Sequence, residues 1–237
     1  MKTSKMSARC GAMILAAGGL VAGVAQAQLY LNTFDNSGSI GVSRFDYSSA
    51  NSSGAVSWSS SDAQNNPSSG SQLMTYTLNT TLDGGSGGAK AAITMDLFYP
   101  GRDYVDLSFD LMVGPGSATD AYGGYGYFGV ATRLTDGYNY NGVWAHELGP
   151  SWDIPLTPGT WVHVDIPLTV GVGGTGTALR ALTFQQYSDS GRNINGTDYI
   201  SIDNLQLTPV PEPSALALLL LGIPAGLIFR ARRAVRG

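Results

Sequence analysis

Apolar and polar residues alternate along most of the chain between Gln28 and Thr208, and no stretch there repeats apolar residues at helical spacing for three turns. In Tyr104–Val113 every second residue from Val105 onward is apolar. A period of two places one side of a strand in a core and the other side in water. The same pattern predicts further strands at Leu29–Phe34, Gly54–Ser59, Gln72–Thr81, Lys90–Leu97, Gly124–Leu134, Thr160–Val170, Ala178–Tyr187 and Asp198–Leu207.

Short runs of turn-forming residues separate the predicted strands, as in Gly114-Pro115-Gly116 and Asn141-Gly142. Strands at this spacing, rich in glycine and serine, predict an all-β fold over residues 28–208: an antiparallel two-sheet β-sandwich, or jelly roll. A β-helix is the alternative, although the chain has no fixed repeat. In the last strand the alternation slips between Ile202 and Leu205, and a bulge at Asp203-Asn204 would absorb that slip.

Residues 1–27 have the composition of a signal peptide. Lys2, Lys5 and Arg9 precede the apolar stretch Gly11–Val24, and Ala25-Gln26-Ala27 fits the small-x-small cleavage pattern. We therefore expect export through the Sec machinery, cleavage by signal peptidase and a mature chain that begins with residue 28.

A second targeting pattern lies in residues 209–237. The tripeptide Pro211-Glu212-Pro213 is followed by the uncharged apolar stretch Ala215–Phe229 and then by Arg230, Arg232 and Arg233. Each proline fixes φ and favours an extended residue before it, so the tripeptide presents a carboxylate on a rigid segment. Clustered arginines resist translocation, so they keep this end of the chain on the cytoplasmic side of a membrane.

This order of tripeptide, apolar helix and arginine cluster resembles the PEP-CTERM sorting signal of Gram-negative bacteria. The resemblance implies that an exosortase cuts at or beside Pro211-Glu212-Pro213. The protein would be anchored transiently in the inner membrane through the apolar helix and then passed to the cell surface or an extracellular polysaccharide matrix. An ordinary single-span anchor is the alternative. The apolar stretch is short for such an anchor. Its 15 residues form a helix about 22 Å long, whereas the hydrocarbon core of a membrane is about 30 Å thick.

Removing both targeting segments changes the charge of the chain. Of the 13 basic residues, three lie in the leader and four in the tail, and one of the 17 acidic residues lies in the tail. The region between them keeps 6 basic and 16 acidic residues, which argues against nucleic acid as a partner. This acidic charge is compatible with neutral glycans and divalent cations as partners. Because Cys10 in the leader is the single cysteine, the exported part has no disulfide, thiolate metal site or cysteine nucleophile.

Three loose motifs resemble the galactose-binding-like jelly rolls, which include many carbohydrate-binding modules. They are Phe34-Asp35, the strand Trp161–Leu168 and the strand Tyr199–Leu205. The resemblance implies a structural Ca²⁺ that ties Asp35 to Asp203, with main-chain oxygens completing its coordination. The alternative is that Asp35 is a turn residue and Asp203 a surface or bulge residue.

Aromatic residues are concentrated between two predicted strands, where a long connection carries Tyr138, Tyr140, Trp144 and Trp152 among amides and carboxylates. Aromatic rings stack on the apolar faces of sugars while neighbouring polar groups bind the hydroxyls. These four residues are therefore our predicted ligand-binding residues for a polysaccharide. The alternative is that they close one end of the sandwich.

Catalytic motifs are weak, and we expect that the protein is not an enzyme. His146-Glu147 begins like a zinc-protease helix, but Pro150 stands where the second histidine is required. Gly84–Gly88 matches the G-x-S-x-G pattern of a nucleophilic serine. It lies in a glycine-rich turn, whereas that pattern requires a turn between a strand and a helix. His163 is expected to be a cross-strand or rim residue rather than a triad base. A structural matrix protein without a specific ligand, and more remotely a divergent glycan hydrolase with two facing carboxylates, stay as alternatives.

Overall fold

The structure is a computed structural model that describes residues 30–83, 88–97, 104–134, 137–138, 144–151, 153–168 and 179–209. Within these ranges no helix is long and apolar enough to cross a membrane. Two of the sequence predictions lie outside the described residues. They are the signal peptide (1–27) and the sorting signal with Pro211, Glu212, Pro213, Arg230, Arg232 and Arg233.

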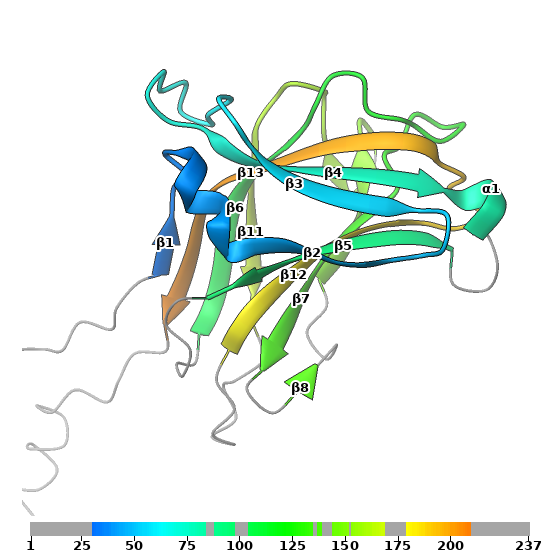
Figure 1. Cartoon of the computed structure of the whole chain (residues 1–237). Coiled ribbons are helices and arrows are strands. Elements are labelled where there is room, and N and C mark those ends of the chain that lie inside the picture. Colours follow the sequence, from blue (N-terminus) through cyan, green and yellow to red (C-terminus); the bar gives the residue numbers. More distant parts are fainter. Residues whose placement is uncertain are drawn as a thin grey trace, which may run out of the picture. The chain divides into compact units, whose positions relative to one another are not determined.

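The described residues form two packed sheets (Figure 1). In spatial order, the first sheet contains β11 (Val162–Pro167), β6 (Tyr104–Val113), β13 (Asn195–Pro209), β4 (Ser71–Asn79) and β3 (Ser53–Ser59), with β1 (Tyr30–Asn32) paired to β13. The second contains β10 (Ile154–Pro155), β9 (Trp144–Gly149), β7 (Tyr127–Leu134), β12 (Leu179–Ser188), β5 (Ala89–Asp96) and β2 (Ser43–Ser48), with β8 (Gly137–Tyr138) paired to β7. The predicted β-sandwich is thus confirmed.

The chain passes repeatedly from one sheet to the other. Strands β4, β6, β11 and β13 belong to the first sheet, and strands β5, β7 and β12, which lie between them in sequence, belong to the second. Such alternation is typical of a jelly roll. The expectation of purely antiparallel sheets was wrong at one edge, where the short strand β10 runs parallel to β9.

Four strands were missed in the sequence: β2, β9 and the two-residue strands β8 (Gly137–Tyr138) and β10 (Ile154–Pro155). In β2 (Ser43–Ser48) a register shift between Phe45 and Tyr47 breaks the alternation on which the prediction relied. Strand β9 (Trp144–Gly149) lies inside the segment expected to be a long connection, and it pairs with β7. Two short helices, η1 (Ser37–Val42) and α1 (Thr80–Asp83), were also not predicted.

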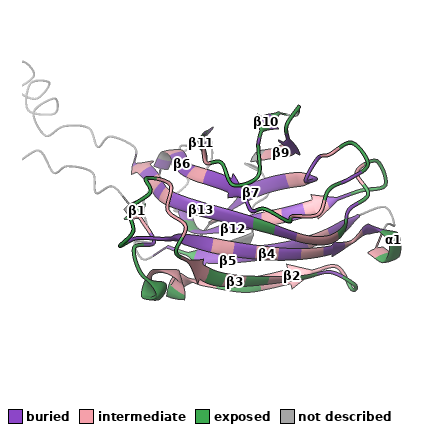
Figure 2. Ribbon diagram, turned by 90° about the horizontal axis from the view of Figure 1, so that it is seen from above, coloured by how far each residue is buried: buried purple, intermediate pink, exposed green. Residues whose placement is uncertain are grey.

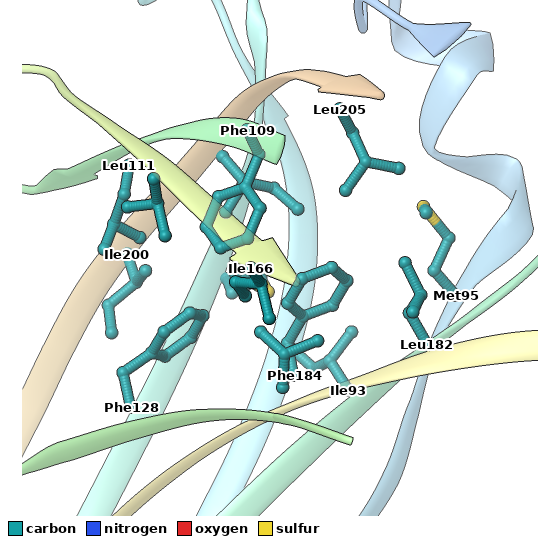
Figure 3. Packing of buried hydrophobic residues seen from close by; sticks show 14 of the residues in the cluster. Ile93, Met95, Phe109, Leu111, Phe128, Ile166, Leu182, Phe184, Ile200 and Leu205 are labelled. Atoms are coloured by element: carbon teal, nitrogen blue, oxygen red, sulfur yellow. The ribbon is translucent and has the colours of Figure 1, made fainter. Parts of the chain in front are cut away.

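The inner faces of the two sheets form one hydrophobic core (Figure 3). Phe109 of β6 meets Phe184 of β12 edge to face, with ring centroids 6.1 Å apart and an interplanar angle of 87°. Tyr76 of β4 also crosses between the sheets, because its hydroxyl donates a hydrogen bond to the Phe184 carbonyl oxygen at 3.0 Å. All three side chains are fully buried. Central strands such as β13 and β12 are largely buried, whereas the edge strand β3 has only exposed and intermediate residues (Figure 2).

The predicted bulge in the last strand is confirmed. The pairing of β13 with β6 shifts between Asp203 and Gln206. Asn204 within the bulge has φ 49°, a left-handed conformation that asparagine tolerates better than most residues. The extra residue lets Ile202 and Leu205 both point into the core, which explains why the alternation changes phase there.

Candidate functional site

The outer face of the second sheet carries the most distinctive group of side chains. Strand β12 turns Leu182 and Phe184 into the core, and each is fully buried. Because successive residues point to opposite sides of a strand, Gln185 and Tyr187 therefore lie on the outer face. In the sheet, Tyr187 is paired with Tyr127 of β7 on one side and with Lys90 of β5 on the other.

Tyrosines dominate this part of the face. The rings of Tyr127 and Tyr187 stack, with centroids 4.8 Å apart and planes 10° from parallel. On β2, the hydroxyl of Tyr47 donates a hydrogen bond to Gln185 Oε1 at 3.1 Å. The ammonium of Lys90 lies 5.9 Å from the centroid of the Tyr47 ring, within the range of a cation–π contact. We call Tyr47, Lys90, Tyr127 and Tyr187 the tyrosine row.

Small buried residues lie beneath the larger side chains on this face. They are Ala92, Thr94, Gly129, Ala131 and Thr183.

A hydrogen-bonded network crosses this floor. The hydroxyl of Thr94 donates to Asp46 Oδ2 at 2.9 Å and lies 2.8 Å from that of Thr183. Arg133 of β7 forms an ion pair with Asp46 of β2, so it spans the two intervening strands β12 and β5. The network holds these four strands at fixed positions under the tyrosine row.

Arg192, in the turn after β12, joins three segments at one end of the face. Its guanidinium is 2.7 Å from Glu147 Oε2 on β9 and 3.6 Å from the buried carboxylate of Asp120. It also lies 5.4 Å from the ring centroid of Tyr122. Tyr122 is 72% exposed, and Arg192 also hydrogen-bonds Tyr127, so one guanidinium contacts both an exposed aromatic ring and the tyrosine row.

The phenols of Tyr127 and Tyr187 stay protonated. Burial raises the pKa of Tyr127, and a hydrogen bond and the negative charge of Glu147 add to that effect. Burial also raises the pKa of Tyr187, with contributions from the charges of Asp189 and Glu147. Neutral phenols both donate and accept hydrogen bonds, as sugar hydroxyls require.

The outer face of the first sheet is chemically different. His163 on the edge strand β11 lies 2.7 Å from Asp110 Oδ1 on β6 and 3.4 Å from Asp165 Oδ1. The hydrogen bond to Asp110 raises the pKa of His163. The imidazole thus pairs across the strands with Asp110 and along its own strand with Asp165, in keeping with the expectation of a cross-strand or rim histidine.

The two predicted calcium ligands both bind the loop between β3 and β4. Asp35 accepts hydrogen bonds from Thr33 and from Ser69 in that loop, at 2.7 and 2.8 Å. Asp203 accepts one from the Ala63 amide of the same loop at 2.9 Å. Burial raises the pKa of Asp203 to about 6.

Calcium at these two carboxylates stays a prediction. Within the described part of the chain no group of three or more His, Cys, Asp or Glu side chains is placed to hold a metal. An ion between Asp35 and Asp203 would therefore depend on main-chain carbonyls and water for most of its coordination.

The four aromatic residues predicted to bind ligand are only partly described. Tyr138 belongs to β8 and Trp144 to β9, so both lie on strands next to β7 rather than in a loop. Their side chains are not described, and Tyr140 and Trp152 lie outside the described residues. Their role in binding stays a prediction.

The tyrosine row was missed in the sequence. Its members come from four strands, and only the sheet register brings them together. The available signal was the outward phase of Tyr187 in its predicted strand. It indicated an exposed aromatic ring but not its neighbours.

No protein-family model matches the sequence, and no curated protein is similar to it. Among solved structures the chain is similar to a family 11 carbohydrate-binding module from Clostridium thermocellum in complex with a β-1,3-1,4-mixed-linked tetrasaccharide (18% identity, 72% of this chain and 91% of that chain, TM-score 0.42). It is similar to the xylan-binding module CBM15 (12% identity, 78% and 98%, TM-score 0.47). It is also similar to the enzymatically active domain of bacteriophage CBA120 tailspike protein 4 (16% identity, 76% and 20%, TM-score 0.44). Similarities at this level do not assign a ligand or an activity to this chain.

A buried carboxyl lies between the two sheets. Asp198 of β13 is fully buried and accepts a hydrogen bond from Gln186 Nε2 of β12 at 3.2 Å. Burial raises its pKa to about 8 from the ordinary value of 3.8. The folded protein therefore keeps a proton that the unfolded chain releases above pH 4.

We expect this proton to make stability depend on pH. The stabilisation is fully present below about pH 4 and is lost as pH rises to about 8, because only the unfolded chain ionises readily in that window. Asp198→Asn should remove this slope and be more stable than the wild type at pH 8. Urea unfolding from pH 5 to 9 measures it, with the exposed Asp96→Asn as the matched control. Parallel curves for the wild type and Asp198→Asn would contradict this assignment.

The calcium prediction is tested by removing metal. If Ca²⁺ joins Asp35 and Asp203, EDTA should lower the thermal midpoint by about 5 °C and added Ca²⁺ should restore it. Asp203→Asn should abolish the response, whereas Asp96→Asn should keep it. An unchanged midpoint after EDTA would eliminate the site.

Proposed function

We propose that this protein is an exported surface or matrix protein, sorted by an exosortase, whose β-sandwich binds a polysaccharide through the outer face of the second sheet. The single observation that carries the binding proposal is the tyrosine row. It combines aromatic rings with amide, hydroxyl and ammonium groups on a support of small buried residues.

The chemistry of the row suits a carbohydrate. The apolar C–H face of a pyranose packs against an aromatic ring, and its hydroxyls need polar partners at the ring edge. Gln185 and Tyr187 lie on β12, and Tyr47 lies on β2 of the same sheet, with β5 between them. A flat chain of sugars can therefore contact several of them at once.

We assign binding rather than catalysis to this face because its carboxylates are already engaged. Glu147 pairs with Arg192, Asp46 with Arg133, and Asp96 with Arg44. A glycosidase needs one carboxylic acid that donates a proton and one free carboxylate. The ion pairs of these carboxylates therefore indicate structural rather than catalytic roles.

The export and sorting parts of the proposal rest on the sequence. The leader at residues 1–27 supports Sec export and signal peptidase cleavage. Pro211-Glu212-Pro213, the apolar stretch and the arginine cluster support recognition by an exosortase. The membrane is then a transient partner through the C-terminal helix, and the surface or matrix is the destination.

Polysaccharide binding is tested on the tyrosine row. Tyr187→Ala in the full chain should weaken binding by roughly threefold to tenfold, since one aromatic contact is removed. Affinity electrophoresis with the producing cell's own polysaccharide measures the change. Tyr199→Ala is the matched control, because Tyr199 is 37% exposed and lies on β13 of the first sheet.

Both variants should keep the wild-type thermal midpoint within a few degrees for the comparison to stand. Equal weakening by Tyr187→Ala and Tyr199→Ala would move the site away from this face. An absence of retardation with every glycan would reject polysaccharide binding and favour a matrix protein without a specific ligand.

Sorting is tested by mass spectrometry of the mature termini in cells with and without the exosortase. We expect a mature chain that starts at Gln28 in both. Its C-terminus should lie at or near Pro211-Glu212-Pro213 only when the exosortase is present. A terminus at Gly237 in both strains would refute the sorting proposal.

A further inference from the structure

Lysine and arginine side chains are confined to one side of the described sandwich. None of the strands of the first sheet contains lysine or arginine. Those strands instead carry the acidic residues Asp106, Asp110, Asp165, Asp198 and Asp203. All the basic residues that the structure describes belong to the strands of the second sheet or to the turn after β12: Arg44, Lys90, Arg133, Arg180 and Arg192.

Most of these cations on the outer face are already neutralised. Arg44, Arg133 and Arg192 each pair with a carboxylate. Lys90 forms no ion pair within the described residues. Its ammonium instead lies over the ring of Tyr47, and its strand partner in the sheet is Tyr187.

The position of Lys90 has a physical consequence. A domain with 16 acidic and 6 basic residues has many carboxylates that could pair with this ammonium. Here its neighbours in the sheet are Ala92, Tyr47 and Tyr187, which carry no charge. The carboxylates whose charges act on Tyr187 are those of Asp189 and Glu147. Both are already bound, Asp189 to the Gly191 and Arg192 amides and Glu147 to the Arg192 guanidinium. A negative group on a ligand can therefore approach Lys90 without displacing a carboxylate of the protein.

We propose that the polysaccharide bound by the tyrosine row is acidic, and that Lys90 determines this specificity by pairing with a uronate carboxylate. The inference rests on the proposed function of the outer face. A sugar that stacks on Tyr187 or Tyr47 brings its C6 carboxylate within reach of the ammonium between them. A charged hydrogen bond of this kind contributes more than a neutral one.

The acidic first sheet supports the same conclusion by exclusion. A polyanion is repelled by a face that carries Asp106, Asp110 and Asp165, because the single imidazole of His163 that pairs with Asp110 and Asp165 cannot neutralise three carboxylates. It can therefore approach the sandwich productively only from the second sheet. The segregation of charge selects the orientation in which the glycan meets the tyrosine row.

The test compares each acidic polysaccharide with its own carboxyl-reduced form, which keeps the linkages and loses the charge. Polygalacturonate, alginate and the producing cell's acidic polysaccharide are run in affinity electrophoresis with the full chain. We expect at least one acidic form to bind about tenfold more tightly than its reduced form. That preference should shrink at 0.5 M salt, where charges are screened over about 4 Å.

The variants identify the residue responsible. Lys90→Met should lower binding of the acidic form by about tenfold and leave the reduced form unchanged, while Lys90→Arg should retain most of the preference. Arg44→Met is the matched control, because it removes the same charge from a position on this face that is already paired with Asp96. It should change binding by less than about twofold.

The outcomes separate the two proposals. Equal binding of acidic and reduced forms, or an acidic preference that survives in Lys90→Met, would overturn the role of Lys90 while leaving glycan binding in place. Failure to bind any acidic or reduced polysaccharide would overturn both. Equal losses in Lys90→Met and Arg44→Met would show that general charge, and not this position, attracts the polyanion, and would also overturn the assignment.

Discussion

The burial of the two inner sheet faces against each other is the constraint on which the rest of the structure depends. Phe109 from one sheet and Phe184 from the other meet edge to face, and Tyr76 adds a hydrogen bond across the same interior. Once Phe184 points inward, the period of two forces Gln185 and Tyr187 outward. A slip of one residue would bury these polar groups and expose the core, so the packing that stabilises the fold also sets the composition of the outer face.

The outer faces then differ because each strand brings its own polar residues to them. The second sheet collects the described basic residues together with Tyr47, Tyr127 and Tyr187, whereas the first collects aspartates and hydroxyls. On the second face the ion pairs and the threonine network tie neighbouring strands together beneath the rings. The aromatic groups are therefore held on a rigid support, which lowers the entropy lost when a ligand binds.

Much of the fold could be predicted because its signal is local. Tyr104–Val113 alternates from Val105 to Leu111 and is a strand with the predicted bounds, and the phase change after Ile202 correctly predicted the bulge at Asp203-Asn204. Strand β2 was missed because its own register shift destroys the period of two. Strand β9 was missed because its residues were read as an aromatic connection, although pairing with β7 makes them extended. Of the predicted aromatic segment, Tyr138 and Trp144 lie on strands of the second sheet, but the tyrosine row was not foreseen.

The sequence by itself determined the class of the fold, the acidic and cysteine-free character of residues 28–208, and the two predicted targeting patterns on either side of them. These properties depend on composition or on residues that are close together in the chain. Only the tertiary structure decided that Tyr47, Lys90, Tyr127 and Tyr187 lie together, since they are separated in sequence and meet through the pairing of β2, β5, β12 and β7. The physical reason is that alternation specifies which side of a strand is buried, whereas the neighbours of a strand are chosen by core packing and register over long distances in the chain.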